Sequence, residues 1–109
     1  AAVRPSDTVA RFGGDEFVVV LTGAGPDQAR RWADGLLEAS RQLGIDCPEG
    51  FAKLSTSIGV ASRLHADKGV KDIVERADKA LYAAKRLGRN RVQAFETLGD
   101  ARLPQITGQ

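Results

Sequence analysis

The chain has 109 residues, 42% hydrophobic and 28% charged, which is ordinary for one globular domain. A single cysteine excludes the disulfide-rich secreted class, and the lack of a long apolar run excludes a membrane-spanning class. The net charge of +2 and the pI of about 9.0 are only weak support for a polyanionic partner such as nucleic acid.

The cysteine and the one histidine give little sign of chemistry. Cys47 and His65 each lack a neighbouring metal-ligating residue, so we interpret them as an incidental loop residue and a surface residue. The lone cysteine and the absence of a cleavable leader lead us to expect a reducing, cytoplasmic setting without direct membrane contact. Whether a longer parent protein is attached to a membrane stays open.

The first half of the chain reads as strand, tight turn, strand and helix. Residues 9–12 and 17–21 are apolar segments joined by "GGDE", whose glycines Gly13 and Gly14 accept the positive φ of primed hairpin turns. After the breaker "GAGPD", a helix is predicted from Asp27, ending near Gly44. Its apolar residues recur at helical spacing: Ala29, Trp32, Ala33, Leu36, Leu37 and Leu43.

The second half predicts a strand, the clearest helix and a short last strand. "GIDCPEG" indicates a loop, and residues 52–61 alternate apolar and polar side chains as in a strand with one buried face. "RNRVQAF" is a short strand, and residues 97–109 lack periodicity, so we expect a flexible tail or the start of a further segment. The helix over 70–87 ends at Gly88 and has one apolar stripe: Val70, Ile73, Val74, Ala77, Ala80, Leu81, Ala84 and Leu87.

This order of elements predicts an α+β fold with helices packed on a mainly antiparallel sheet. Residues 1–96 would form the domain and residues 97–109 the tail.

The turn "GGDE" is the most unusual feature of the sequence, because Asp15 and Glu16 are adjacent and point to opposite sides of an extended backbone. Glycines let a bulky ligand approach the backbone, and a carboxylate beside them can hold magnesium against phosphate oxygens. The motif alone also fits a glycine hairpin whose acids are merely solvated.

Three separated segments resemble one family. "RFGGDEFVVVL" resembles the signature of the GGDEF family, the bacterial diguanylate cyclases, with the signature intact from Gly13 to Phe17. "LSTSIGVA" (54–61) is similar to the family's Ser-Ile-Gly strand, and "ADKALYAAKRLGRNRV" (77–92) is similar to its final helix and strand. The resemblance covers the chain from Arg4 to about Phe95. It implies a nucleotide-cyclase-like fold, ferredoxin- or palm-like, with the signature on a β-hairpin.

The resemblance also implies an activity, the condensation of two GTP molecules into cyclic di-GMP and pyrophosphate by a homodimer. Asp15 would coordinate Mg²⁺ (or Mn²⁺) and help to activate the attacking hydroxyl, and Glu16 would be a required acid with a positional role. Gly13 and Gly14 would lie against the nucleotide.

Two further pairs match the family. Lys85 and Arg89 match its phosphate-binding cations, although cations at a helix C-terminus are often only solvated. Arg4 and Asp7 in "RPSD" match its RxxD inhibitory site for the product, where arginine and aspartate can contact the edges of guanine. The alternative for Asp7 is an ordinary turn or strand cap. Arg30 or Arg31 could add a third basic contact, and the sequence does not choose between them.

The sequence also departs from the family. Nothing in it resembles the motifs "DxDxFKxxND" or "GHxxGD", which carry the other metal-binding aspartate and the guanine-recognising residues. We therefore expect this chain to hold half an active site and to be inactive when isolated. The family's first strand would lie centrally in the sheet, so we also expect either low stability or closure by a second copy.

Two other functions remain open. The first is a module of the same fold that binds cyclic di-GMP or GTP without turnover. The second is a nucleic-acid-binding domain, which is supported only by the pI and the basic cluster over 85–91. Trp32 and Tyr82 lie on predicted helix faces, where core packing is the expected use of aromatic residues.

Overall fold

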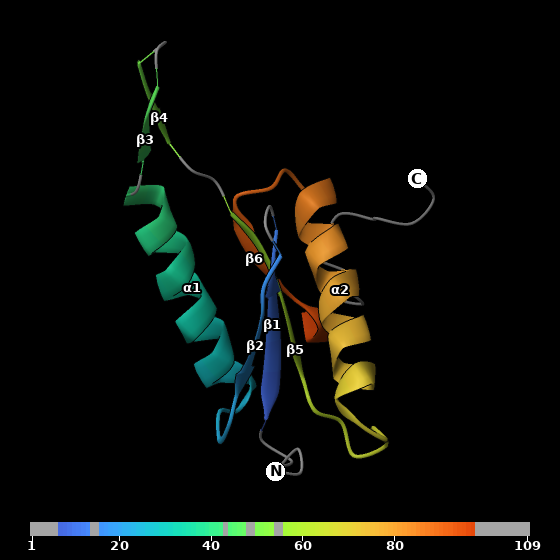
Figure 1. Ribbon diagram of the computed structural model, residues 1–109. Helices are drawn as coiled ribbons and strands as arrows, with labels where there is room; N and C mark the ends of the chain where they lie inside the picture. The colour runs from blue at the N-terminus through green and yellow to red at the C-terminus, as the bar shows by residue number, and fades with distance from the viewer. Residues whose placement is uncertain (1–6, 14–15, 43, 48–49, 54–55, 98–109) are drawn as a thin grey trace.

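A computed structural model describes residues 7–13, 16–42, 44–47, 50–53 and 56–97. Its main unit has three layers, with a four-stranded sheet between two long helices (Figure 1). The sheet contains β1 (Thr8–Phe12), β2 (Val18–Leu21), β5 (Ser57–Ser62) and β6 (Arg91–Ala94). The helices are α1 (Pro26–Gln42) and α2 (Val70–Arg86), and a short 3₁₀ helix, η1 (Phe95–Thr97), follows β6.

The sheet has the strand order β2-β1-β5-β6. The strand β1 is antiparallel to both β2 and β5, whereas β5 and β6 are parallel. The predicted α+β fold with a mainly antiparallel sheet is therefore confirmed, with one parallel pair that the sequence did not reveal.

The centre of the sheet is paired without a gap. The expectation of low stability or closure by a second copy rested on a central strand that this sequence lacks. In the structure, β1 pairs with β2 through Thr8–Arg11 and with β5 through Thr8–Phe12. Among the described strands, the outer edges of this sheet belong to β2 and β6. An exposed edge can pair with another chain, and the side chains of Val18 and Val20 on β2 are exposed.

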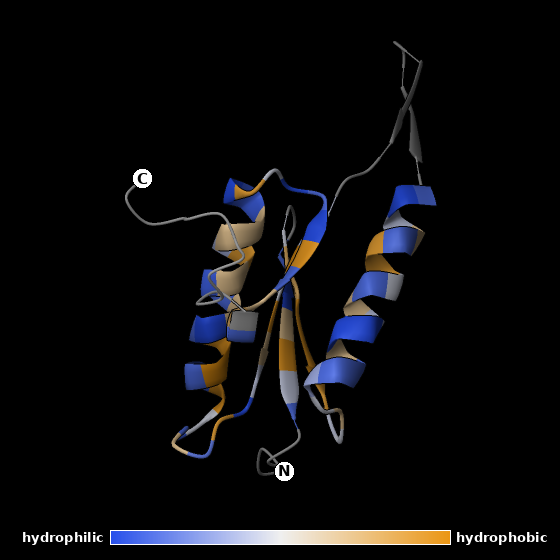
Figure 2. Ribbon diagram, turned by 180° about the vertical axis from the view of Figure 1, so that it is seen from behind, coloured by the Kyte–Doolittle hydropathy of each residue, from blue (hydrophilic) through white to orange (hydrophobic). Residues whose placement is uncertain are grey.

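Each face of the sheet carries its own core. On one face, α1 packs against Ile58, Val60 and Val92, and on the other, α2 packs against Val9 and Ala61. All six residues of β5 are buried, so the expectation of one buried face is wrong, because helices cover both faces of this strand. In Figure 2, both helices alternate between hydrophilic and hydrophobic segments, as helices with one apolar side do.

The segment between α1 and β5 corrects two further predictions. The expected loop "GIDCPEG" contains β3 (Gly44–Cys47) and the start of β4 (Gly50–Lys53), which pair as an antiparallel ribbon. The ribbon extends past the end of α1, away from the main sheet (Figure 1). The strand predicted over 52–61 is thus two strands, because the chain pairs locally in β4 before it enters the main sheet as β5.

The remaining expectations concern single residues. Tyr82 is 56% exposed and Trp32 is 39% exposed, so core packing is wrong for Tyr82 and incomplete for Trp32, which stacks on Phe12 at 6.2 Å between ring centroids. His65 is exposed, as expected of a surface residue. The tail beyond Thr97 lies outside the described residues. Within the described part of the chain, neither helix has the length and apolar character needed to cross a membrane.

Candidate nucleotide site

The signature turn connects β1 to β2 and is held on both sides. The Phe12 N–H donates to the Phe17 carbonyl at 3.0 Å and closes the hairpin. The Gly13 N–H donates to the Ser57 carbonyl at 2.7 Å, which ties the turn to the start of β5. The Phe12 and Phe17 rings meet edge to face with 6.2 Å between centroids. Gly14 and Asp15 lie outside the described residues.

The constraint at Gly13 is limited space and not its backbone angle. The prediction of a positive φ at Gly13 is wrong, since only Gly23 and Gly88 among the described glycines have one. A Cβ at Gly13 would lie 3.2 Å from the Ser57 carbonyl oxygen and 3.3 Å from Cε of Lys85. The stem of Lys85 therefore packs on the first glycine of the signature, and the structure brings these two predicted site residues together.

Glu16 is engaged by a cation from β1. Arg11 donates to Glu16 Oε1 through Nε at 3.0 Å and through Nη2 at 2.8 Å. The same guanidinium donates through Nη1 to Oδ2 of Asp78 in α2 at 2.8 Å. Sequence reasoning missed Arg11 and Asp78, which lie 67 positions apart and share no local signal. It also missed Ser57 as a neighbour of the turn.

The end of α2 forms a tight, cationic loop. The helix is closed by bonds from Leu87 N–H to the Ala83 carbonyl at 2.8 Å and from Arg89 N–H to the Ala84 carbonyl at 2.9 Å. Arg89 and Asn90 then adopt left-handed backbone angles, with φ of 63° and 51°. Lys85 is half-buried beside Gly13, whereas Arg89 is exposed just beyond the helix end.

The loop is braced from α1. Arg41 donates from Nη2 to the Asn90 carbonyl at 3.2 Å and from Nε to Asn90 Oδ1 at 3.3 Å. Consecutive left-handed residues other than glycine are unfavourable, and they persist only where surrounding contacts hold them. These bonds link the C-terminal ends of the two long helices.

Asp7 lies at the opposite end of the sheet from the signature turn. It is only 3% exposed, its Oδ1 accepts a bond from the Gly23 N–H at 3.4 Å, and its carbonyl accepts one from the Arg63 N–H at 3.1 Å. These contacts agree with the ordinary turn-capping role considered for it. Arg4, its predicted partner, lies outside the described residues.

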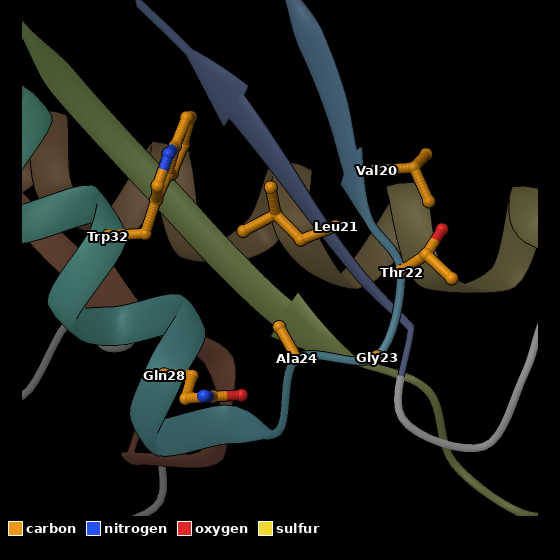
Figure 3. Close-up of a pocket in the computed structure, with 7 residues that line it drawn as sticks. All are labelled: Val20, Leu21, Thr22, Gly23, Ala24, Gln28 and Trp32. Carbon is orange, nitrogen blue, oxygen red and sulfur yellow. The ribbon is translucent and has the colours of Figure 1, made fainter.

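A hollow of about 470 Å³ lies between β2 and the start of α1 (Figure 3). Its lining includes Gly23, whose N–H donates to Asp7. Figure 3 shows Trp32 and Leu21 side by side along it. Two arginines were considered for the inhibitory site. Nε of Arg30 lies 3.5 Å from Oδ1 of Asp34, and Arg31 is exposed. The lining residues are Val20, Leu21, Thr22, Gly23, Ala24, Gln28 and Trp32.

One ion pair fixes the connection between β5 and α2. Asp67 accepts bonds from Arg76 Nη1 at 2.6 Å and Nη2 at 2.5 Å, and from the Leu64 N–H at 2.7 Å. The hydrogen bonds from Arg76 lower the pKa of Asp67, and Asp67 in turn raises the pKa of Arg76. Arg76 also donates to the Ser62 carbonyl at 2.9 Å, so the pair anchors the helix start to the strand end.

The described residues do not by themselves form a metal site. Within the described ranges, no three histidine, cysteine or acidic side chains gather as metal ligands would. Glu16 is bonded to Arg11, and Asp15 is among the residues outside the description. The described geometry instead brings one cation, Lys85, against the first glycine of the turn.

Comparison with known families settles the kinship of this chain. A family model described as "Diguanylate cyclase, GGDEF domain" matches residues 1–91. The chain belongs to the GGDEF domain family. Diguanylate cyclases of this family generally use a divalent metal. The signature turn, the Ser-Ile-Gly strand and the final helix named from the sequence are therefore parts of a GGDEF domain.

Curated relatives of the GGDEF family include two bacterial cyclases. Diguanylate cyclase A of Treponema denticola is 38% identical over 105 residues, which is 96% of this chain and 27% of the relative. Diguanylate cyclase DosC of Escherichia coli (strain K12) is 39% identical over 95 residues, which is 86% of this chain and 20% of the relative. The chain thus spans less than a third of the length of these relatives.

Solved GGDEF domains have the same fold. The GGDEF domain of DgcB from Caulobacter crescentus, in complex with c-di-GMP, matches with a TM-score of 0.69 at 29% identity, over 77% of this chain and 49% of that chain. The GGDEF domain of PA1120 (YfiN or TpbB) from Pseudomonas aeruginosa matches with a TM-score of 0.63 at 38% identity, over 84% and 57%. These matches confirm the fold that the resemblance implied.

Proposed function

We propose that this chain is part of the catalytic domain of a diguanylate cyclase, which condenses two GTP molecules into cyclic di-GMP. In each half-reaction the 3′-hydroxyl of one GTP attacks the α-phosphorus of the other. A bond from the 3′-oxygen to the α-phosphorus forms, the bond from that phosphorus to the pyrophosphate oxygen breaks, and pyrophosphate leaves. The hydroxyl proton passes to a general base, a transfer that Asp15 would assist. The observation that carries the proposal is the packing of Lys85 on Gly13, because it sets a cation beside a turn with little side-chain bulk.

The residues of this chain would divide the work of binding. Gly13 and Gly14 let the nucleotide approach the backbone, while Lys85 and Arg89 neutralise the triphosphate. The basic cluster over 85–91 then serves a nucleotide and not a nucleic acid. Asp15 would hold Mg²⁺ or Mn²⁺, which supplies charge neutralisation at the phosphates.

The chain on its own would not turn over GTP. It contains no segment resembling the family's other metal-binding aspartate or its guanine-recognising residues. Turnover would need a complete domain and a homodimer, in which two domains each present one GTP. We place this catalytic domain in the bacterial cytoplasm, without direct membrane contact.

Product would restrain the enzyme at a separate site. We assign Arg4 and Asp7 to an RxxD inhibitory site for cyclic di-GMP. The relative DgcB, solved with c-di-GMP, supports product binding in this family. Because Asp7 is buried against Gly23, binding there would require the carboxylate to exchange that contact for the ligand. Calorimetric titration of this chain with cyclic di-GMP tests the assignment. Arg4→Ala and Asp7→Ala should both abolish binding, and retained binding in either variant would remove that residue from the site.

The catalytic proposal is tested with the full-length protein, GTP and MgCl₂, and the product is detected by chromatography with mass spectrometry. Lys85→Ala should lower the affinity for GTP by about tenfold or more, because it removes a charge-assisted contact. Lys79→Ala, which changes an exposed lysine on the same helix, is the matched control and should bind like the wild type. Binding of GTP or cyclic di-GMP without product would instead identify a receptor module.

A further inference from the structure

The guanidinium of Arg11 bridges two carboxylates that come from distant parts of the chain. Nε and Nη2 face Glu16 in the signature turn, and Nη1 faces Asp78 in α2 at 2.8 Å. The rigid fork of arginine fixes these directions relative to each other. A single arginine thus couples the position of the turn to the position of the helix.

Asp78, the partner of Arg11 in α2, lies on a stretch of helix that packs tightly on β5. A Cβ at Gly59 would lie 2.2 Å from the Ala77 carbonyl oxygen and 2.2 Å from the Leu81 nitrogen, so the α2 backbone rests directly on β5. Gly59 is the register partner of Arg11 in the neighbouring strand. Asp78, which follows Ala77, is therefore held close to Arg11 by backbone packing and not by a long flexible side chain.

We propose that Asp78 is a positioning residue for the cyclase reaction, acting through Arg11 on Glu16. This inference rests on the proposed function. Asp78 and Lys85 lie about two turns apart on α2, so the same side of the helix reaches the turn at both points. Lys85 packs on Gly13, and Asp78 orients the arginine that holds Glu16. The turn that carries Asp15 is then fixed at its first glycine and directly after that aspartate.

The matched variants are Asp78→Asn and Glu75→Gln in the full-length protein. Each removes one negative charge from α2, but Glu75 is exposed and has no described contact with the turn. Asp78→Asn should lower kcat for cyclic di-GMP synthesis by about tenfold with KM changed by less than about twofold, because geometry is lost while the phosphate contacts remain. Asp78→Glu should recover most of the rate. In an Arg11→Ala background, Asp78→Asn should have no further effect, since its action passes through Arg11.

Hydrogen exchange gives a second readout that does not need activity. The Phe12 N–H bonds to the Phe17 carbonyl across the turn, so its exchange rate reports how well the turn is held. Asp78→Asn should raise this rate several-fold, and Glu75→Gln should leave it unchanged.

The outcomes separate the two proposals. A full-length wild type that makes no cyclic di-GMP refutes the proposed function, and the exchange experiment then still decides whether Asp78 holds the turn. An active wild type whose kcat is unchanged by Asp78→Asn overturns the positioning role, whatever the exchange rate does. Equal effects of Asp78→Asn and Glu75→Gln would also overturn it, because they would reflect charge alone.

Discussion

Replacing Gly59 by alanine should displace α2 from the sheet. The added Cβ would lie 2.2 Å from a backbone oxygen, 2.2 Å from a backbone nitrogen and 2.7 Å from the Leu81 Cα. Backbone atoms cannot rotate away as a side chain can, so the helix must move outward by about 1 Å or more to restore ordinary contact distances. Overpacking of this kind costs about 3 kcal/mol, the upper part of the usual range.

The assay is unfolding in urea and by heat, followed by far-ultraviolet circular dichroism. For a chain of this size the expected loss corresponds to a fall in Tm of roughly 10–20 °C. Gly35→Ala in α1 is the matched control, because a Cβ there meets nothing within 4 Å. It should raise the unfolding free energy by about 1 kcal/mol, the difference in helix propensity between the two residues.

A loss of less than about 1 kcal/mol for Gly59→Ala would refute the argument. It would mean that α2 can shift outward without giving up its packing on Val9 and Ala61. A normal Tm together with lost GTP binding would have a different meaning. Helix α2 could then move without loss of stability, and its packing on β5 would matter only for nucleotide binding.

Three other changes test separate parts of the structure. The bonds from Arg76 lower the pKa of Asp67 below its ordinary value of 3.8. The ion pair therefore stabilises the fold fully above about pH 4, and this stabilisation is lost as the pH falls through the lowered pKa. The stability difference between wild type and Asp67→Asn should therefore be constant near neutral pH and shrink below about pH 4; a constant difference down to acid unfolding would contradict the pair's role. Asn90→Ala should destabilise the chain by about 1–2 kcal/mol in urea unfolding because alanine resists the left-handed backbone, whereas Asn90→Gly should cost clearly less. Val20→Lys on the exposed edge strand β2 should weaken self-association in sedimentation experiments without lowering Tm, and unchanged association would remove this edge as a contact between copies.

The long helices and the hairpin were predictable because their signals are local. Five of the eight residues in the apolar stripe predicted over 70–87 are buried, namely Ile73, Ala77, Ala80, Leu81 and Ala84. Val74 and Leu87 are partly buried, and Val70 at the start of the helix is exposed. The paired ribbon β3–β4 was missed because glycine and proline are typical of loops and of hairpin turns alike. Trp32 stays partly exposed although its spacing is helical, because it stacks on Phe12 at the margin of the core and lines an open hollow.

The candidate site was only partly predictable. Family resemblance placed Gly13 and Lys85 in one site, and the structure brings them into contact. The Arg11–Asp78 bond joins residues of β1 and α2 that are remote in the sequence, so no local pattern could reveal it. Gly59 did carry a signal. A glycine inside an otherwise apolar strand indicates close approach of another backbone, and here that backbone is α2.

The backbone contact between α2 and Gly59 of β5 therefore supports both the fold and the candidate site. The contact of Lys85 with Gly13 and the bond from Arg11 to Asp78 both require the helix to lie at the distance that Gly59 allows. A change at Gly59 should lower stability and nucleotide binding together, because both depend on the same backbone contact. A change at Asp78 should lower the reaction rate with little loss of stability, since exposed ion pairs contribute at most about 1 kcal/mol. The contrast between these two variants distinguishes a residue that supports the fold from one that positions the signature turn.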